Sequence, residues 1–80
     1  MTQLKNRHRP ARVTAARLRA GLTKTQLAEK LSCSLSLISE IESGRKDVTP
    51  TRLKGLAEAL EVEISYLASP EYLAEQGDAA

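Results

Sequence analysis

The side chains best suited to bind a polar partner share one side of residues 34–43. In a helix each residue turns by about 100°, so Ile38 and Ile41 fall on one face and the polar residues on the opposite arc. The segment begins at Ser34, and that arc carries Leu35, Ser36, Ser39, Glu40 and Ser43. Its hydroxyls and its carboxylate can donate and accept hydrogen bonds. The arc therefore predicts a binding surface, and the alternative interpretation is a plain solvent-exposed face.

Basic side chains gather at one end of the sequence and acidic ones at the other. The first 28 residues hold seven bases and no acid: Lys5, Arg7, Arg9, Arg12, Arg17, Arg19 and Lys24. Residues 55–80 hold six acids and no base: Glu58, Glu61, Glu63, Glu71, Glu75 and Asp78. The net charge of 12 − 10 = +2 hides this asymmetry. A folded chain would have one basic pole, which would suit the binding of a polyanion. The alternative is that these charges are solvated and have no function.

The composition excludes several function classes. Eighty residues with 41% hydrophobic and 28% charged side chains predict one soluble globular domain. Tyr66 and Tyr72 are the only aromatics, too few for a platform that stacks single-stranded bases. The longest apolar run is three residues, Tyr66 to Ala68, so we expect no membrane span. With no secretory signal either, we expect a cytoplasmic protein.

Catalysis and metal binding are not expected. His8 is the only histidine, and no carboxylate or nucleophile is fixed beside it in the sequence. Cys33 is the only cysteine, so it forms no internal disulfide and no Cys/His cluster that would hold a metal. The sequence therefore predicts a protein that is not an enzyme and needs no cofactor.

Helices must position these side chains, because apolar residues recur every three or four positions and no stretch alternates like a strand. We expect helices near 11–20, 24–31, 34–43 and 50–60, a short one near 64–68 and a possible sixth over 70–76. Thr23 with Gln26 forms a capping box, Ser34 and Thr49 cap the next two helices, and Cys33 packs beside the third. Gly55 inside a helix should cost about 1 kcal/mol and has no functional explanation.

The predicted fold is all-α, a compact five-helix bundle with a possible short sixth helix. Residues 1–10 are expected to be a flexible basic arm, 11–68 the folded domain, and 69–80 a short C-terminal helix and tail. Only Ser32 and Cys33 separate the helix near 24–31 from the one at 34–43. So short a joint forces the two helices to cross steeply, as in a helix-turn-helix, whose second helix enters the major groove of DNA.

The sequence resembles the Xre family of phage-repressor and Cro-type helix-turn-helix proteins over roughly residues 12–67. The resemblance lies in Arg17, Gly21–Thr23, Leu27–Leu31, Ser34, Ile38–Gly44 and Leu56–Leu60. It implies a lambda-repressor-like bundle that binds operator DNA, usually as a homodimer. It also implies a partly buried ion pair between Arg17 and Glu42.

By this resemblance, residues 34–43 form the recognition helix. The expected base contacts are Ser34, Leu35, Ser36, Ser39 and Glu40, with Glu40 accepting from cytosine and Leu35 touching a thymine methyl. The expected phosphate contacts are Thr23, Lys24, Thr25, Ser43, Arg45, Lys46 and Arg52. The arm residues Lys5, Arg7, Arg9 and Arg12 can follow the backbone or enter the minor groove. Two departures from the family are Lys24, where many members have Gln, and the absence of Arg, Lys, Asn or Gln on the outward arc.

These features predict a sequence-specific regulator that binds double-stranded DNA, most simply a repressor. One alternative is an antitoxin-like or restriction-controller-like autoregulator with a protein partner. Exposure of the C-terminal apolar side chains would favour it: Ile64, Tyr66, Leu67, Tyr72 and Leu73. A second alternative is a protein-interaction module without specific DNA binding, which the sparse base-reading chemistry of residues 34–43 would suit.

Overall fold

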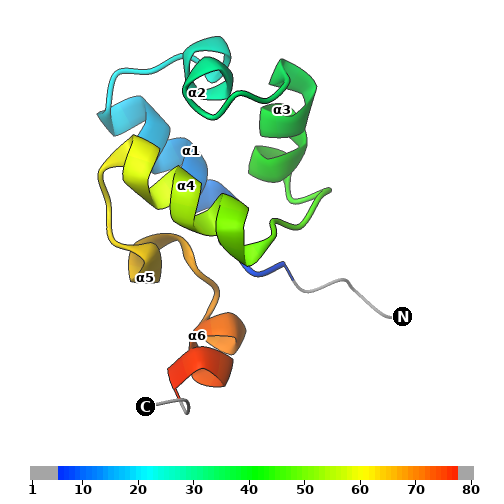
Figure 1. The fold of residues 1–80 in the computed structure, drawn as a ribbon, viewed down its shortest axis with the longest axis vertical. Helices are drawn as coiled ribbons and strands as arrows, with labels where there is room; N and C mark the ends of the chain where they lie inside the picture. Colours follow the sequence, from blue (N-terminus) through cyan, green and yellow to red (C-terminus); the bar gives the residue numbers. More distant parts are fainter. Residues whose placement is uncertain (1–5, 78–80) are drawn as a thin grey trace.

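Except for α5, the helices of the described range begin at capping side chains or prolines. The computed structural model describes residues 6–77, over which it places α1 (Pro10–Arg19), α2 (Lys24–Lys30), α3 (Leu35–Ser43), α4 (Pro50–Leu60), α5 (Ile64–Leu67) and α6 (Pro70–Gly77) (Figure 1). No strand forms in this range, and one isolated antiparallel bridge joins His8 to Ala68. The predicted all-α bundle with a short sixth helix is confirmed. None of these helices is long and apolar enough to cross a membrane.

Four helix starts are capped by a hydroxyl side chain. The backbone N–H of Gln26 donates to Thr23 Oγ1 at 3.0 Å, and the N–H of Thr23 donates to Gln26 Oε1 at 2.8 Å, which completes the predicted capping box. Ser34 caps α3 and Thr49 caps α4 in the same way, with N–H···Oγ distances of 3.1 and 3.0 Å. Ser69 caps α6 at 3.2 Å. These bonds satisfy orphan backbone donors, each worth about 1 kcal/mol.

The core lies where α1, α2, α3, α4 and α5 meet. Its fully buried side chains are Val13, Leu27, Ile38, Ile41, Leu53, Leu56 and Leu67. Each fully buried aliphatic side chain contributes roughly 1.5–3 kcal/mol, so this cluster supplies most of the driving force for folding. In Figure 1, α2 and α3 lie on one side of the α1–α4 pair, and α5 and α6 lie on the other. Cys33 packs against this core but is only partly buried.

The segment before α1 is part of the folded body. His8 is 2% exposed, and its ring Nε2–H donates to Ile41 O at 2.8 Å. The backbone also pairs with the α5–α6 joint, through Arg9 N to Leu67 O at 2.7 Å and Ser69 N to Arg7 O at 2.8 Å. The predicted flexible arm over residues 1–10 therefore does not hold for residues 6–10, because a buried ring and backbone hydrogen bonds fix them. The rest of that arm, including Lys5, lies outside the described residues.

Candidate nucleic-acid interface

The joint between α2 and α3 is a tight turn. Ser32 adopts a left-handed conformation with φ of 55°, which costs energy for a residue with a side chain. The backbone N–H of Ser32 donates to Glu29 O at 3.2 Å, and that of Cys33 donates to Ala28 O at 3.0 Å. These bonds close the end of α2, and α2 and α3 then pack directly against each other. The turn therefore fixes the direction in which α3 leaves α2.

The two faces of α3 have opposite environments. Ile38 and Ile41 are at most 1% exposed and anchor the helix in the core. On the other side Ser34, Leu35, Ser36 and Ser43 are exposed, and Ser39 and Glu40 are half-buried. Leu35 alone keeps 49% of its surface in solvent. None of the six predicted residues of this helix is buried, so the fold leaves them reachable by a partner.

The polar groups on this outward face are mostly unused by the fold. Ser43 Oγ donates to Glu40 O at 3.1 Å, so that hydroxyl is partly engaged. Among residues 6–77, the Ser36 and Ser39 hydroxyls and the Glu40 carboxylate make no hydrogen bond or ion pair. Unpaired polar groups on a rigid helix keep their full capacity for base edges. Their contact with particular bases stays a prediction.

The predicted phosphate contacts fall on three segments beside α3. Thr23, Lys24 and Thr25 are exposed at the start of α2. Arg45 and Lys46 are exposed in the loop that follows α3, and neither has a carboxylate partner within the described range. Lysine and arginine in such positions can neutralise phosphates without reading sequence.

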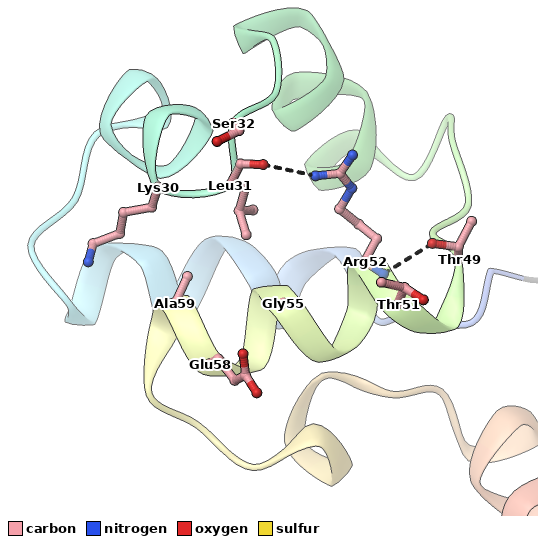
Figure 2. A pocket seen from close by; sticks show the side chains of 9 residues that line it. All are labelled: Lys30, Leu31, Ser32, Thr49, Thr51, Arg52, Gly55, Glu58 and Ala59. Atoms are coloured by element: carbon pink, nitrogen blue, oxygen red, sulfur yellow. Dashed lines mark hydrogen bonds between the residues drawn. The ribbon is translucent and has the colours of Figure 1, made fainter.

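Arg52 has a structural contact besides its predicted role. It projects from α4 across a groove lined by Lys30, Leu31, Ser32, Thr49, Thr51, Arg52, Gly55, Glu58 and Ala59 (Figure 2). Its Nη1–H donates to Leu31 O at 3.4 Å, a long hydrogen bond to the end of α2. Arg52 is half-buried, so it links α4 to the turn while part of the guanidinium stays accessible. Across the same groove Gly55 approaches Leu31, and a Cβ at Gly55 would lie 3.5 Å from Leu31 Cδ2, an ordinary contact.

The predicted arm residues are engaged within the protein. Arg7 Nη1 contacts Asp47 Oδ2 at 2.6 Å. Arg12 Cζ lies 4.7 Å from the centroid of the Tyr66 ring, and its Nη1–H donates to Tyr66 O at 3.1 Å. Arg9 bonds Leu67 O through its backbone, and its buried Nε has no partner among residues 6–77. The structure therefore does not bring these three arginines together with the outward face of α3 as a free arm.

Arg12 in particular points away from α3. At about 100° per residue, it lies roughly 140–160° around α1 from Arg17 and Thr14, which both contact α3 through Glu42. Arg19 shares the side of Arg12, with its Cζ 5.9 Å from the Tyr66 ring centroid. These two arginines therefore belong to the α1–α5 side of the molecule.

The ion pair between Arg17 and Glu42 is confirmed. Arg17 Nε–H donates to Glu42 Oε2 at 2.7 Å and Nη2–H donates to Oε1 at 3.2 Å, with the two side chains only 9% and 5% exposed. Thr14 Oγ1 donates to Oε1 at 2.8 Å, and Arg17 Nη1 donates to Leu22 O at 2.9 Å. The pair ties α3 to α1 and to the turn before α2, so it holds the recognition element in place.

Two further residues contact α3 or the loop after it, and the sequence alone does not indicate them. Asp47 accepts from Arg7, and His8 bonds the last turn of α3. No local pattern marks either residue, since both partners lie more than 30 positions away in the chain. Among the described residues, no group of three His, Cys, Asp or Glu side chains could hold a metal ion.

The C-terminal apolar side chains mostly complete the protein's own core. Leu67 is fully buried, and Tyr66, Tyr72 and Leu73 are partly buried against the core cluster. Ile64 is the exposed member of this set, at 37%. Within this set, Ile64 alone therefore offers an exposed apolar side chain to a protein partner.

Comparison with known proteins agrees with this geometry. A family model described as helix-turn-helix matches residues 13–67. The chain is similar to the structure of the restriction-modification controller protein C.AhdI of Aeromonas hydrophila, with 26% identity, 71% of this chain and 86% of that chain covered, and a TM-score of 0.68. It is also similar to the clp gene regulator ClgR of C. glutamicum, with 28% identity, 88% of this chain and 84% of that chain covered, and a TM-score of 0.67. The fold is shared with the hypothetical transcription factor NHTF of Neisseria, which is 18% identical. That match covers 94% of this chain and 96% of that chain, with a TM-score of 0.64. No curated protein sequence matches significantly.

Proposed function

Because this chain belongs to the Xre-type helix-turn-helix family of DNA-binding transcriptional regulators, we propose that it represses promoters by laying α3 in the major groove of specific sites. The inner face of α3 is anchored by buried Ile38 and Ile41. On its outer face the Ser36 and Ser39 hydroxyls and the Glu40 carboxylate make no bond within residues 6–77. A rigid helix with free hydrogen-bonding groups is what direct readout of base edges requires.

The proposed base contacts are few and chemically specific. Glu40 accepts a hydrogen bond from a cytosine N4 donor, and Leu35 presses on a thymine methyl group. Ser34, Ser36 and Ser39 supply hydroxyls that bond either bases or phosphates. Because the arc has no arginine, lysine, asparagine or glutamine, the shape and deformability of the DNA supply part of the specificity.

The proposed phosphate contacts surround α3. Lys24, Arg45 and Lys46 neutralise phosphates directly, and Thr23, Thr25, Ser43 and Arg52 add hydrogen bonds. Arg12 is a weaker candidate for DNA, because it stacks on Tyr66 at the α1–α5 side of the molecule. The contacts near α3 therefore set the register of the protein on the duplex.

Selection of bound duplexes from a random DNA pool, followed by fluorescence anisotropy at several salt concentrations, tests this function. We expect one enriched motif and an affinity that falls steeply with salt. Replacing Arg45 with Gln should lower the slope of log K against log salt by about 0.9, the value for one phosphate contact. Arg19→Gln is the matched control and should leave the slope unchanged, since Arg19 lies beside Tyr66. A pool without enrichment, or binding insensitive to salt, would reject the proposal and favour a protein-interaction module.

We propose that the protein binds its operator as a homodimer, because two-fold half-sites are usual for this docking geometry. Ile64, exposed on α5, is the candidate contact between the copies. Light scattering of the protein on its selected duplex should give two copies per site. One copy per site, with Ile64→Glu binding as tightly as wild type, would contradict this.

The alternative of a controller-like autoregulator is favoured by one observation, the similarity to a restriction-modification controller protein. On that alternative the selected motif occurs upstream of the protein's own coding region, and binding there reduces its own transcription. In either case we propose a protein without enzymatic activity that works in the cytoplasm at the nucleoid. Absence of the motif from that upstream region would remove the autoregulatory alternative.

A further inference from the structure

The segment before α1, residues 6–9, contacts the end of α3 and the loop that follows it. His8 Nε2–H donates to Ile41 O at 2.8 Å, and Asn6 Nδ2–H donates to Gly44 O at 3.0 Å. Ile41 O also accepts from the Gly44 N–H at 3.2 Å, so the His8 ring is its second donor, whereas the Asn6 amide supplies a donor to a carbonyl just beyond the helix end. A Cβ placed on Gly44 would lie 3.3 Å from Pro10 Cγ, which shows how closely the two segments approach. The N-terminal segment is therefore a lateral support for the end of α3.

Arg7 and Asp47 form the centre of this contact. The backbone N–H of Arg7 donates to Asp47 Oδ1 at 2.6 Å, and its Nη1–H donates to Oδ2 at 2.6 Å. The same Nη1 donates to Val48 O at 3.0 Å, and the Val48 N–H donates to Asp47 Oδ1 at 2.8 Å. Both the guanidinium and the backbone of Arg7 are thus bonded to the loop. Charge-assisted bonds to one carboxylate give this contact a defined geometry.

The loop held in this way carries two of the proposed phosphate contacts. Arg45 and Lys46 are exposed, and their backbone N–H groups donate to Glu40 O at 3.0 and 3.3 Å. One end of the loop is fixed by Gly44, at a left-handed φ of 82°. The other end is fixed by Asp47 and by Val48, which is buried. The Arg7–Asp47 pair therefore anchors the end of the loop that directly follows the two cations.

We propose that Arg7 and Asp47 are positioning residues for DNA binding, which hold the Gly44–Val48 loop so that Arg45 and Lys46 reach the phosphate backbone. This proposal rests on the proposed function. It assigns Arg7 a different role from that of a basic arm residue that touches DNA itself. It also means that an acidic side chain beside the interface strengthens the binding of an acidic polymer.

Whether removal of Asp47 raises or lowers the affinity for DNA distinguishes simple repulsion of DNA from a positioning role. If Asp47 only repels DNA, its removal deletes one negative charge near the phosphates, and affinity rises. If Asp47 positions the loop, its removal frees the loop, and affinity falls in spite of the gained positive charge. Glu58, exposed on α4 and without an ion pair in the described range, provides the electrostatic baseline.

The test is the Kd for the selected duplex, measured by fluorescence anisotropy for wild type and variants. We expect Asp47→Ala and Arg7→Ala each to weaken binding about fivefold, the scale of a partly exposed ion pair. The double variant should bind no more weakly than Arg7→Ala, because the two single changes break the same contact. Glu58→Ala should bind as tightly as wild type or slightly tighter. Asp47→Ala binding as tightly as wild type, or losses that multiply in the double variant, would overturn the proposal.

Hydrogen exchange in the free protein supplies a readout that does not need DNA. The Arg45 and Lys46 amides should exchange faster in Asp47→Ala, while the Ile38 amide, which donates to Ser34 O within α3, should not change. Asp47→Asn keeps an acceptor for the Val48 amide and should show a smaller effect in both assays. If wild type selects no DNA motif, the proposed function fails. Unchanged exchange of the two loop amides would refute the positioning role by itself.

Discussion

Replacing Glu42 with Ala should severely destabilise the fold. The change leaves the Arg17 guanidinium, whose side chain is 9% exposed, without the carboxylate that accepts from its Nε and Nη2. A buried charge deprived of its partner costs about 3–5 kcal/mol. An 80-residue domain has roughly 4–12 kcal/mol of total stability, at 0.05–0.15 kcal/mol per residue. The variant should therefore lose a large part of its stability, and its melting temperature should fall by at least about 12 °C.

Thermal and urea unfolding followed by circular dichroism at 222 nm measures this effect. Replacing both partners, with Arg17→Met and Glu42→Leu, should cost much less than Glu42→Ala, because no buried charge is then stranded. Thr14→Val is a matched control that removes the hydroxyl bond to Glu42 Oε1 and a long one to Pro10 O at 3.5 Å, and it should cost about 1 kcal/mol. Equal melting temperatures of wild type and Glu42→Ala would refute the reasoning.

Three further substitutions test the local structure by the same unfolding assay. Gly55→Ala should raise stability by up to about 1 kcal/mol, because its Cβ meets only Leu31 at 3.5 Å, and a lower melting temperature would contradict this. His8→Ala should lower stability by about 2–4 kcal/mol, since it opens a cavity and leaves Ile41 O without its side-chain donor. A loss below about 0.5 kcal/mol would show that the ring is not packed. Ser32→Gly should stabilise by about 1 kcal/mol because it relieves a φ of 55°, and unchanged stability would argue against strain at the turn.

The parts of the fold that follow from local chemistry were predictable from the sequence. Thr23, Ser34 and Thr49 cap helices with backbone groups three residues away, so their signal lies within one turn of the chain. The outward arc of α3 follows from helical periodicity once Ile38 and Ile41 are assigned to the core. The Arg17–Glu42 pair was predicted from the family resemblance, since the two residues are 25 positions apart.

The N-terminal segment was not predictable because its contacts are long-range. His8 sits in a polar, basic stretch without periodicity, and its partner Ile41 is 33 positions away. Arg12 was predicted to contact DNA because of its charge alone. In the structure its guanidinium stacks on the ring of Tyr66 and donates to Tyr66 O, 54 positions further along the chain. Composition and periodicity do not reveal that a single side chain bonds a backbone carbonyl far away in the chain. Residues 6–10 were therefore predicted to belong to a flexible arm.

The base preference of a Glu40→Gln variant tests whether the outer face of α3 reads base edges. Random-pool selection is carried out on wild type, on Glu40→Gln and on the control Glu58→Gln, whose side chain is exposed on α4. We expect Glu40→Gln to change the preferred base at one position of each half-site, from cytosine towards adenine, because an amide pairs with adenine N6 and N7. The control should select the wild-type motif. An unchanged motif for Glu40→Gln, with wild-type affinity, would contradict the placement of α3 in the major groove.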